Sequence, residues 1–165
     1  MKTLKVASYF HPEDVDAVIA NLQQLKDGLR PVRYGISERF SKRMGKVDDI
    51  KAFGQFREKN PLGYFLFSER FMYNITKSSV TYANMVIYPR DANIEKRDVL
   101  EMFGIVAEHH MIFGYACESS EYDYRNRYYK TIGNSSIEAW VGRDLRNTCQ
   151  AFTGSHAFQL LSFKG

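Results

Sequence analysis

The chain contains few cysteines and lacks any long apolar run. Cys117 and Cys149 are its two cysteines, and their wide separation in sequence matches no metal-binding motif. No apolar run approaches the roughly 20 residues that a membrane-spanning helix needs. The opening residues, MKTLKVASYF, are too polar for a secretory signal. We therefore expect a cytoplasmic protein without membrane contact and with free thiols, although a disulfide between the two cysteines stays open.

Motifs that carry enzyme chemistry are also missing. His109 and His110 are adjacent, so on a helix they point about 100° apart and do not form a metal-binding pair. Cys117 lies in an apolar strand pattern, with no local cation to lower the pKa of its thiol. Lys46 follows a glycine but precedes Val47, so the phosphate-loop motif fails. We therefore expect no cofactor, no metal and no catalytic residue.

Aromatic and basic residues are plentiful instead. The chain has 12 Phe and 11 Tyr, more than a small core needs, so some of these rings are expected at an interface. Alternatively, the tyrosines line the faces of a sheet. Residues 30–60 hold nine Lys or Arg and four acidic residues, and therefore carry a charge of +5. The net charge of the whole chain is +4, so the remaining residues sum to −1. This charge favours an acidic protein surface or a phosphate backbone as partner, or else belongs to a solvated linker.

Hydrophobic periodicity predicts one α+β domain spanning residues 1–165, with a mostly antiparallel sheet and two main helices packed on it. The main helices are expected within residues 11–31, where Pro12 opens the first turn and Gly28 marks the end, and after a cap at Asn93. Residues 46–60 fit a third helix that Gly54 would weaken. Strands are expected at residues 4–10, 32–36, 63–68, 71–76, 80–89, 113–119, 136–142 and 157–163.

The stretch from Glu121 to Asn147, EYDYRNRYYKTIGNSSIEAWVGRDLRN, concentrates tyrosine and arginine. On a helix its side chains would form two opposite faces. One face holds Tyr122, Arg125 and Tyr129, and the other holds Tyr124, Arg127 and Tyr128. Tyrosine and arginine are frequent hot spots in protein interfaces, and they also stack on bases and hold phosphates. This stretch could therefore be a protein interface or a nucleic-acid surface. Alternatively, it is the charged rim of a helix whose tyrosines lie in the core.

The segments YDYRNRYY and IEAWVGRD, at residues 122–129 and 137–144, resemble the immunity protein fifty-two family of bacterial polymorphic toxin systems. That family continues into a Pro-Gly-Leu-Tyr-Trp motif, whereas this chain continues NTCQAFTGSHAFQLLS from Asn147. The resemblance implies a small non-enzymatic protein that binds a cognate toxin made beside it. It implies no catalytic residues.

These observations predict a bacterial toxin inhibitor that occludes the active or substrate-binding surface of its partner. The expected contact residues are Tyr122, Tyr124, Arg125, Arg127, Tyr128 and Tyr129, with Arg39, Lys42, Arg43 and Lys46 steering an acidic partner. One alternative is a nucleic-acid-binding or phage-encoded regulatory protein that uses the same residues. Another is an enzyme with a carboxylate site, such as a nuclease built from Glu118, Asp123 and Arg125. An exposed closing strand would also permit a dimer.

Overall fold

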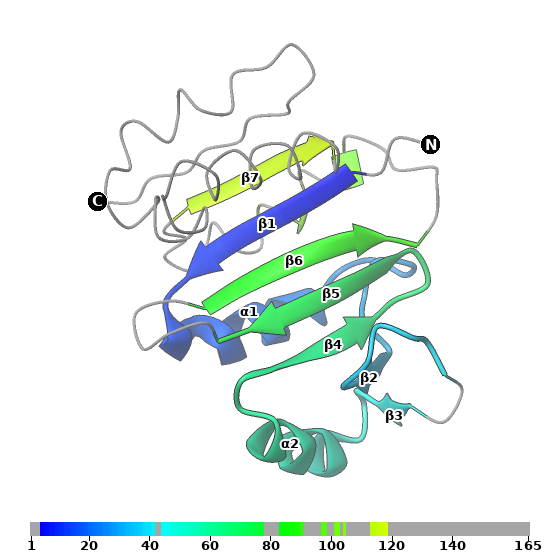
Figure 1. Ribbon diagram of the computed structural model, residues 1–165. Helices are drawn as coiled ribbons and strands as arrows, with labels where there is room; N and C mark the ends of the chain where they lie inside the picture. Colours follow the sequence, from blue (N-terminus) through cyan, green and yellow to red (C-terminus); the bar gives the residue numbers. More distant parts are fainter. Residues whose placement is uncertain are drawn as a thin grey trace.

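An antiparallel sheet with helices on one face organises the computed structural model of the protein (Figure 1). The structure describes residues 4–41, 44–77, 83–90 and 113–118, together with Arg97, Asp98, Glu101, Met102 and Gly104. The strands are β1 (Leu4–Phe10), β2 (Arg33–Gly35), β3 (Gly45–Lys46), β4 (Gly63–Phe67), β5 (Phe71–Thr76), β6 (Ala83–Pro89) and β7 (Phe113–Glu118). The helices are the 3₁₀ turn η1 (Pro12–Asp14), α1 (Val15–Leu22) and α2 (Ile50–Lys59).

The sheet order is β3-β2-β4-β5-β6-β1-β7, and each of these neighbouring pairs is antiparallel. Strands β4, β5 and β6 form an antiparallel meander. Their connections are short, so each strand returns beside the one before it. The β4–β5 turn is held by Ser68, whose hydroxyl accepts a hydrogen bond from the Phe71 amide at 2.9 Å. The first strand in sequence lies inside the sheet, between β6 and β7.

Helix α1 is shorter than the sequence predicts. Its apolar side chains Val18, Ile19 and Leu22 are buried as expected, but the α-helix ends at Leu22. Leu25 and Leu29, which continue the helical spacing, are buried from the turns that follow. Gly28 in this loop has a φ of 86°, a left-handed conformation that glycine adopts readily. The helix predicted within residues 11–31 therefore forms over its first part, and turns replace it after Leu22.

Helix α2 forms despite Gly54. Asp49 caps its first turn, because the carboxylate accepts a hydrogen bond from the Ala52 amide at 3.1 Å. Phe53 is buried, whereas Ile50, one turn earlier in the helix, is 84% exposed. The ring of Tyr34 on β2 lies 4.8 Å from that of Phe53 and 4.5 Å from that of Phe56. Helix α2 is therefore fixed on β2 by aromatic contacts.

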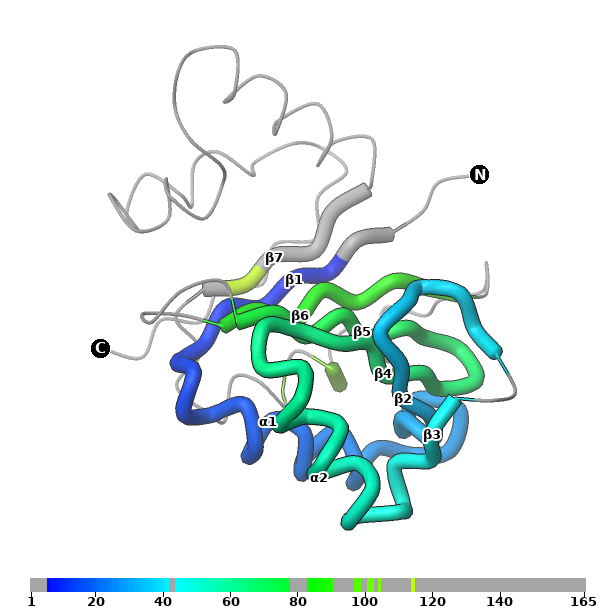
Figure 2. The backbone as a smooth tube through the Cα atoms, turned by 60° about the horizontal axis from the view of Figure 1, so that its bottom comes forward, coloured from blue at the N-terminus to red at the C-terminus, as the bar shows by residue number. Residues whose placement is uncertain are grey.

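Both α1 and α2 lie on the same face of the sheet (Figure 2). The main core lies between them and the sheet, and it includes Leu22, Leu66, Tyr73, Met85 and Ile87. The predicted α+β fold is confirmed for the described residues. No helix among these residues is long and apolar enough to cross a bilayer.

The second predicted main helix falls mostly outside the described residues. Five of its residues, named above, are described, and all of them are helical. Asp98 and Met102 in this group are completely buried. The hydroxyl of Tyr73 lies 3.7 Å from the sulfur of Met102 and donates a 2.6 Å hydrogen bond to the carbonyl of Leu29. Tyr73 thus links β5 to the loop after α1 and to this helical group.

Candidate functional site

The hairpin that β2 and β3 form exposes apolar and basic side chains together. Residues 36–41 are all exposed, and Ile36 and Phe40 are 67% and 47% exposed. Arg39 lies in the same exposed run, and Lys46 on β3 is exposed as well. We call Ile36, Arg39, Phe40, Lys46 and the adjoining Arg90 the hairpin surface. Exposed apolar side chains that lie close to basic ones are a feature of protein-interaction surfaces.

Phe40 is held between an arginine and a second aromatic ring. The guanidinium of Arg90 lies 4.5 Å from the centroid of the Phe40 ring, a cation–π distance. The ring of Phe67 on β4 meets Phe40 edge-on at 5.8 Å between centroids. Arg90 is itself fixed, because its guanidinium donates to the carbonyl of Ser68 and its amide donates to the carbonyl of Arg70. Phe40 is therefore positioned before any partner arrives.

The base of the hairpin depends on a close approach between Gly45 and Tyr34. A Cβ atom at position 45 would lie 2.1 Å from Cζ of the Tyr34 ring, which leaves room for glycine and for no larger residue. The Nη1 atom of Arg33 also donates to the carbonyl of Met44 at 3.1 Å. These two contacts hold β2 and β3 together at the base of the hairpin.

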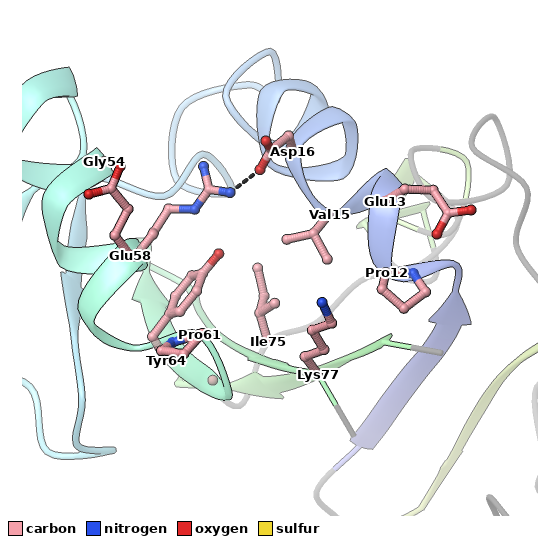
Figure 3. A pocket seen from close by; sticks show the side chains of 12 residues that line it. Pro12, Glu13, Val15, Asp16, Gly54, Glu58, Pro61, Tyr64, Ile75 and Lys77 are labelled. Carbon is pink, nitrogen blue, oxygen red and sulfur yellow. Dashed lines mark hydrogen bonds and ion pairs between the residues drawn. The ribbon is translucent and has the colours of Figure 1, made fainter. Parts of the chain in front are cut away.

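A separate cleft of about 460 Å³ opens on the helix side of the sheet (Figure 3). It lies between the start of α1, the middle of α2 and the ends of β4 and β5. Its apolar wall includes Pro12, Val15, Pro61 and Ile75, and its polar residues include Glu13, Asp16, Arg57, Glu58, Tyr64 and Lys77. An ion pair between Arg57 and Asp16, drawn as a dashed line in Figure 3, joins α2 to α1 across it.

Two adjacent polar side chains border this cleft. Tyr64 is only 5% exposed, and its hydroxyl lies beside the guanidinium of Arg57. Burial raises the pKa of Tyr64, and the positive charge of Arg57 and a side-chain hydrogen bond with it oppose this increase only in part. The Tyr64 hydroxyl consequently keeps its proton at neutral pH and remains a donor.

The structure places only two of the predicted site residues. Arg39 lies in the loop between β2 and β3, Lys46 lies on β3, and both side chains are exposed. Lys42 and Arg43 lie outside the described residues, as do Tyr122, Tyr124, Arg125, Arg127, Tyr128 and Tyr129. The sequence prediction missed Phe40, whose signal was a large apolar residue inside an exposed, charged run. It also missed Arg90, Arg57 and Tyr64, which no local pattern marks.

Comparison with known proteins leaves the family of this chain unassigned. No protein-family model, no curated protein and no solved structure gave a significant match. In the described part of the chain, no group of three His, Cys, Asp or Glu residues is placed to hold a metal ion. The resemblance to immunity protein fifty-two therefore stays a prediction.

Proposed function

We propose that this protein is a non-enzymatic binding protein of the immunity type, which neutralises a bacterial toxin by covering its active or substrate-binding surface. The observation that carries the proposal is the hairpin surface, where a half-exposed Phe40 is fixed by Arg90, next in sequence to exposed Arg39, on a hairpin whose β3 strand carries exposed Lys46. The resemblance of residues 122–129 and 137–144 to an immunity family suggests a toxin as the class of partner.

A fixed aromatic ring is well suited to a tight interface. Burying the exposed half of Phe40 removes apolar area from water, and the ring loses little further freedom because Arg90 and Phe67 already hold it. Arginine beside an aromatic ring is typical of residues that dominate binding energy. The hairpin surface therefore has the composition of an interface centre rather than of an ordinary solvated turn.

The charge of residues 30–60 selects the partner. A local charge of +5 attracts an acidic surface and accelerates association with it. Arg39 and Lys46 expose part of this charge on the same hairpin as Phe40, so steering and anchoring would act at one hairpin. We further propose that the Tyr and Arg residues of positions 122–129 form a second part of the contact area.

The first experiment combines capture with a test of neutralisation. The full chain is tagged and used to capture proteins from its native cells at high salt, and the captured protein is then expressed alone and together with the chain. We expect a stoichiometric partner that arrests growth when expressed alone and is harmless when co-expressed. Phe40→Ala should weaken this protection, whereas Ile50→Ala, which truncates an exposed side chain on α2, should leave it intact.

The same experiment distinguishes toxin binding from the alternative function, nucleic-acid binding. If the basic segment binds nucleic acid, the captured material will be nucleic acid that is released as salt rises from about 50 to 200 mM. A tight protein partner should survive that wash, because buried contacts are screened less than exposed charges. Capture of nucleic acid alone, or of a protein without toxicity, would contradict the proposed function.

A further inference from the structure

The second face of the sheet, which points away from α1 and α2, carries no charged side chain on β4, β5 or β6. Side chains along a strand alternate between the two faces, and the main core takes one set. The other set consists of Phe65, Phe67, Met72, Asn74, Thr76, Asn84, Val86 and Tyr88. Both described α-helices lie on the opposite side of the sheet (Figure 2). An antiparallel sheet with one face toward water usually has polar side chains there, so the apolar members of this set need an explanation.

The strand register gathers these apolar side chains into one patch. A row of directly opposed residues crosses five strands and consists of Lys46, Arg33, Phe67, Met72 and Tyr88. Directly opposed side chains share a face and touch, with about 4.5–5.5 Å between Cβ atoms. In the next row Phe65 lies opposite Asn74, which lies opposite Val86. The third row pairs Thr76 with Asn84, so the face becomes polar only there.

Two side chains from the β2–β3 hairpin extend the patch. Gly35 lies opposite Phe65, and a Cβ atom at Gly35 would lie 2.9 Å from Cε of Met44, so the Met44 side chain covers Gly35 on the second face. Phe40 meets the buried ring of Phe67 edge-on. We call the sheet patch Phe40, Met44, Phe65, Phe67, Met72, Val86 and Tyr88. Its half-buried members, which a partner can still reach, are Met44, Phe65, Met72 and Tyr88.

The composition of the sheet patch favours a protein partner over a nucleic acid. Aromatic residues, Met and Arg are enriched at the centres of protein interfaces, and methionine adapts its shape to a partner. Single-stranded nucleic acid needs open ring faces and cations that are free to hold phosphates. Here Arg90 already stacks on the ring of Phe40. The guanidinium groups of Arg33 and Arg90 also donate to the backbone carbonyls of Met44 and Ser68.

The charges that border the sheet patch select an acidic partner. The first row ends in Arg33 and Lys46. Arg39 is the neighbour in sequence of a patch residue, and Arg90 stacks on the same ring. Glu38 is the one acidic residue in the exposed loop 36–41. Hydrogen bonds to neutral carbonyls leave the charge of an arginine intact, so this border attracts carboxylates.

We propose that the sheet patch binds an amphipathic helix of the partner, with Leu, Ile or Phe on one side of the helix and Asp or Glu beside them. A sheet buries an apolar face against a helix or a second sheet, and α1 and α2 already cover the opposite face of this one. The apolar side of the helix would cover Phe65 and Met72, and its carboxylates would face Arg33 and Lys46. This inference rests on the proposed function only for the identity of the partner as the toxin.

Methionine methyl groups report where such a helix binds. The full-length protein, labelled with ¹³C at the methionine methyl groups, is titrated with a synthetic peptide of about 18 residues. The peptide has Leu at helical spacing on one side and Glu and Gln elsewhere. We expect saturable shifts of the Met44 and Met72 signals, which Met44→Leu and Met72→Leu assign. The signals of Met85 and Met102 should not move, because both side chains lie in the main core. A peptide with Lys in place of Glu should bind about tenfold more weakly.

Two variants test the sheet patch directly, with thermal unfolding as the check on folding. Phe65→Thr keeps a residue that favours strands but removes the ring, and it should weaken the acidic peptide about tenfold. Leu62→Thr is the matched control, because Leu62 is 75% exposed and lies outside the patch, and it should leave the affinity unchanged. The methyl shifts of the unaltered protein locate the site even if Phe65→Thr does not fold.

Four results would overturn the inference. The first is an acidic peptide that leaves Met44 and Met72 unshifted, and the second is a Lys peptide that binds as tightly. The third is a uridine oligonucleotide that shifts the same signals and displaces the peptide, which would assign the patch to nucleic acid. The fourth is a dimer in sedimentation that Phe65→Thr dissociates, which would assign it to a second copy. Capture of a toxin without peptide binding would overturn this inference alone, and peptide binding without any toxin would overturn the proposed function alone.

Discussion

Asp98 is a buried acidic residue that forms ion pairs with two basic side chains. It is completely buried, and its carboxylate lies 2.9 Å from Nζ of Lys26 and 2.7 Å from Nη1 of Arg70. It thereby connects the second predicted helix to the loop after α1 and to the turn before β5. Hydrogen bonds to Asp98 and Glu101 raise the pKa of Lys26, so Lys26 stays charged at neutral pH.

Asp98→Asn should lower the free energy of unfolding by about 1–3 kcal/mol, because a neutral amide replaces the buried carboxylate that pairs with Lys26 and Arg70. Most of this loss should come from Arg70, since the side chain of Lys26 is 41% exposed and that of Arg70 is 26% exposed. Urea denaturation at neutral pH measures it. Asp27→Asn is the control, because that carboxylate is 94% exposed in its pair with Arg30 and should contribute little. Equal losses in both variants would refute the role of burial.

Tyr73 makes stability depend on alkaline pH. Burial is the main cause that raises the pKa of Tyr73 above its ordinary value of 10.0; a hydrogen bond with Ser68 opposes it, and Glu101 and Asp98 add to it. Because the folded pKa is raised, the stabilisation is complete below pH 10 and is lost as pH rises through the folded value, while the unfolded chain ionises. We expect the free energy of unfolding to fall above about pH 10, by up to about 1.4 kcal/mol per pH unit from this group.

Tyr73→Phe provides the test by urea denaturation between about pH 8 and pH 11. At neutral pH the variant should be less stable by about 1 kcal/mol, since the hydrogen bond to Leu29 is lost. Above pH 10 the gap should narrow, because phenylalanine has no proton to release. Part of the slope should persist in the variant, as the pKa of Tyr64 is raised too. Parallel pH curves for the two proteins would show that Tyr73 is not the group responsible.

At the scale of single elements, two glycines should respond to alanine in opposite directions. Gly45→Ala places a Cβ atom 2.1 Å from the Tyr34 ring, so the ring or the hairpin must move, at a cost of about 1–3 kcal/mol. Gly54 lies inside α2 with no atom within 4 Å of its added Cβ, so Gly54→Ala should stabilise the protein by about 0.5–1 kcal/mol. Thermal unfolding of both variants checks the signs, and a stabilising Gly45→Ala would contradict the close approach.

Regular elements were predictable where periodicity and turn chemistry agree. Strands β1 and β5 were predicted with the bounds observed. Apolar and polar side chains alternate clearly along both strands, and the flanking residues end this alternation. The end of α1 was wrong, since Leu25 and Leu29 follow helical spacing yet are buried from turns around the left-handed Gly28. Strand β3 escaped prediction because two residues carry no periodicity, and its existence depends on pairing with β2.

At the scale of the whole molecule, the candidate sites depend on topology more than on motifs. The charge of the hairpin was visible in sequence, as Arg39 and Lys46 show. Its anchoring was not, because Arg90 reaches Phe40 only after β4, β5 and β6 have paired. The cleft likewise needs α1, α2 and two strands before Arg57 and Tyr64 meet. Sequence patterns report residues that share an element, whereas these contacts join residues from different elements.

In the proposed function the hairpin surface has two separable roles, steering by charge and anchoring by Phe40, and binding kinetics can distinguish them. Replacing Arg39 and Lys46 together by glutamine removes exposed charge and should mainly slow association with the captured partner, with a smaller effect at high salt. Phe40→Ala should mainly speed dissociation, by about 30-fold if the ring is a hot spot worth about 2 kcal/mol. Lys51→Gln with Lys59→Gln on α2 is the charge-matched control. If the control slows association as much as the hairpin pair does, the net charge of the protein sets the association rate, and Arg39 and Lys46 make no specific contribution to it.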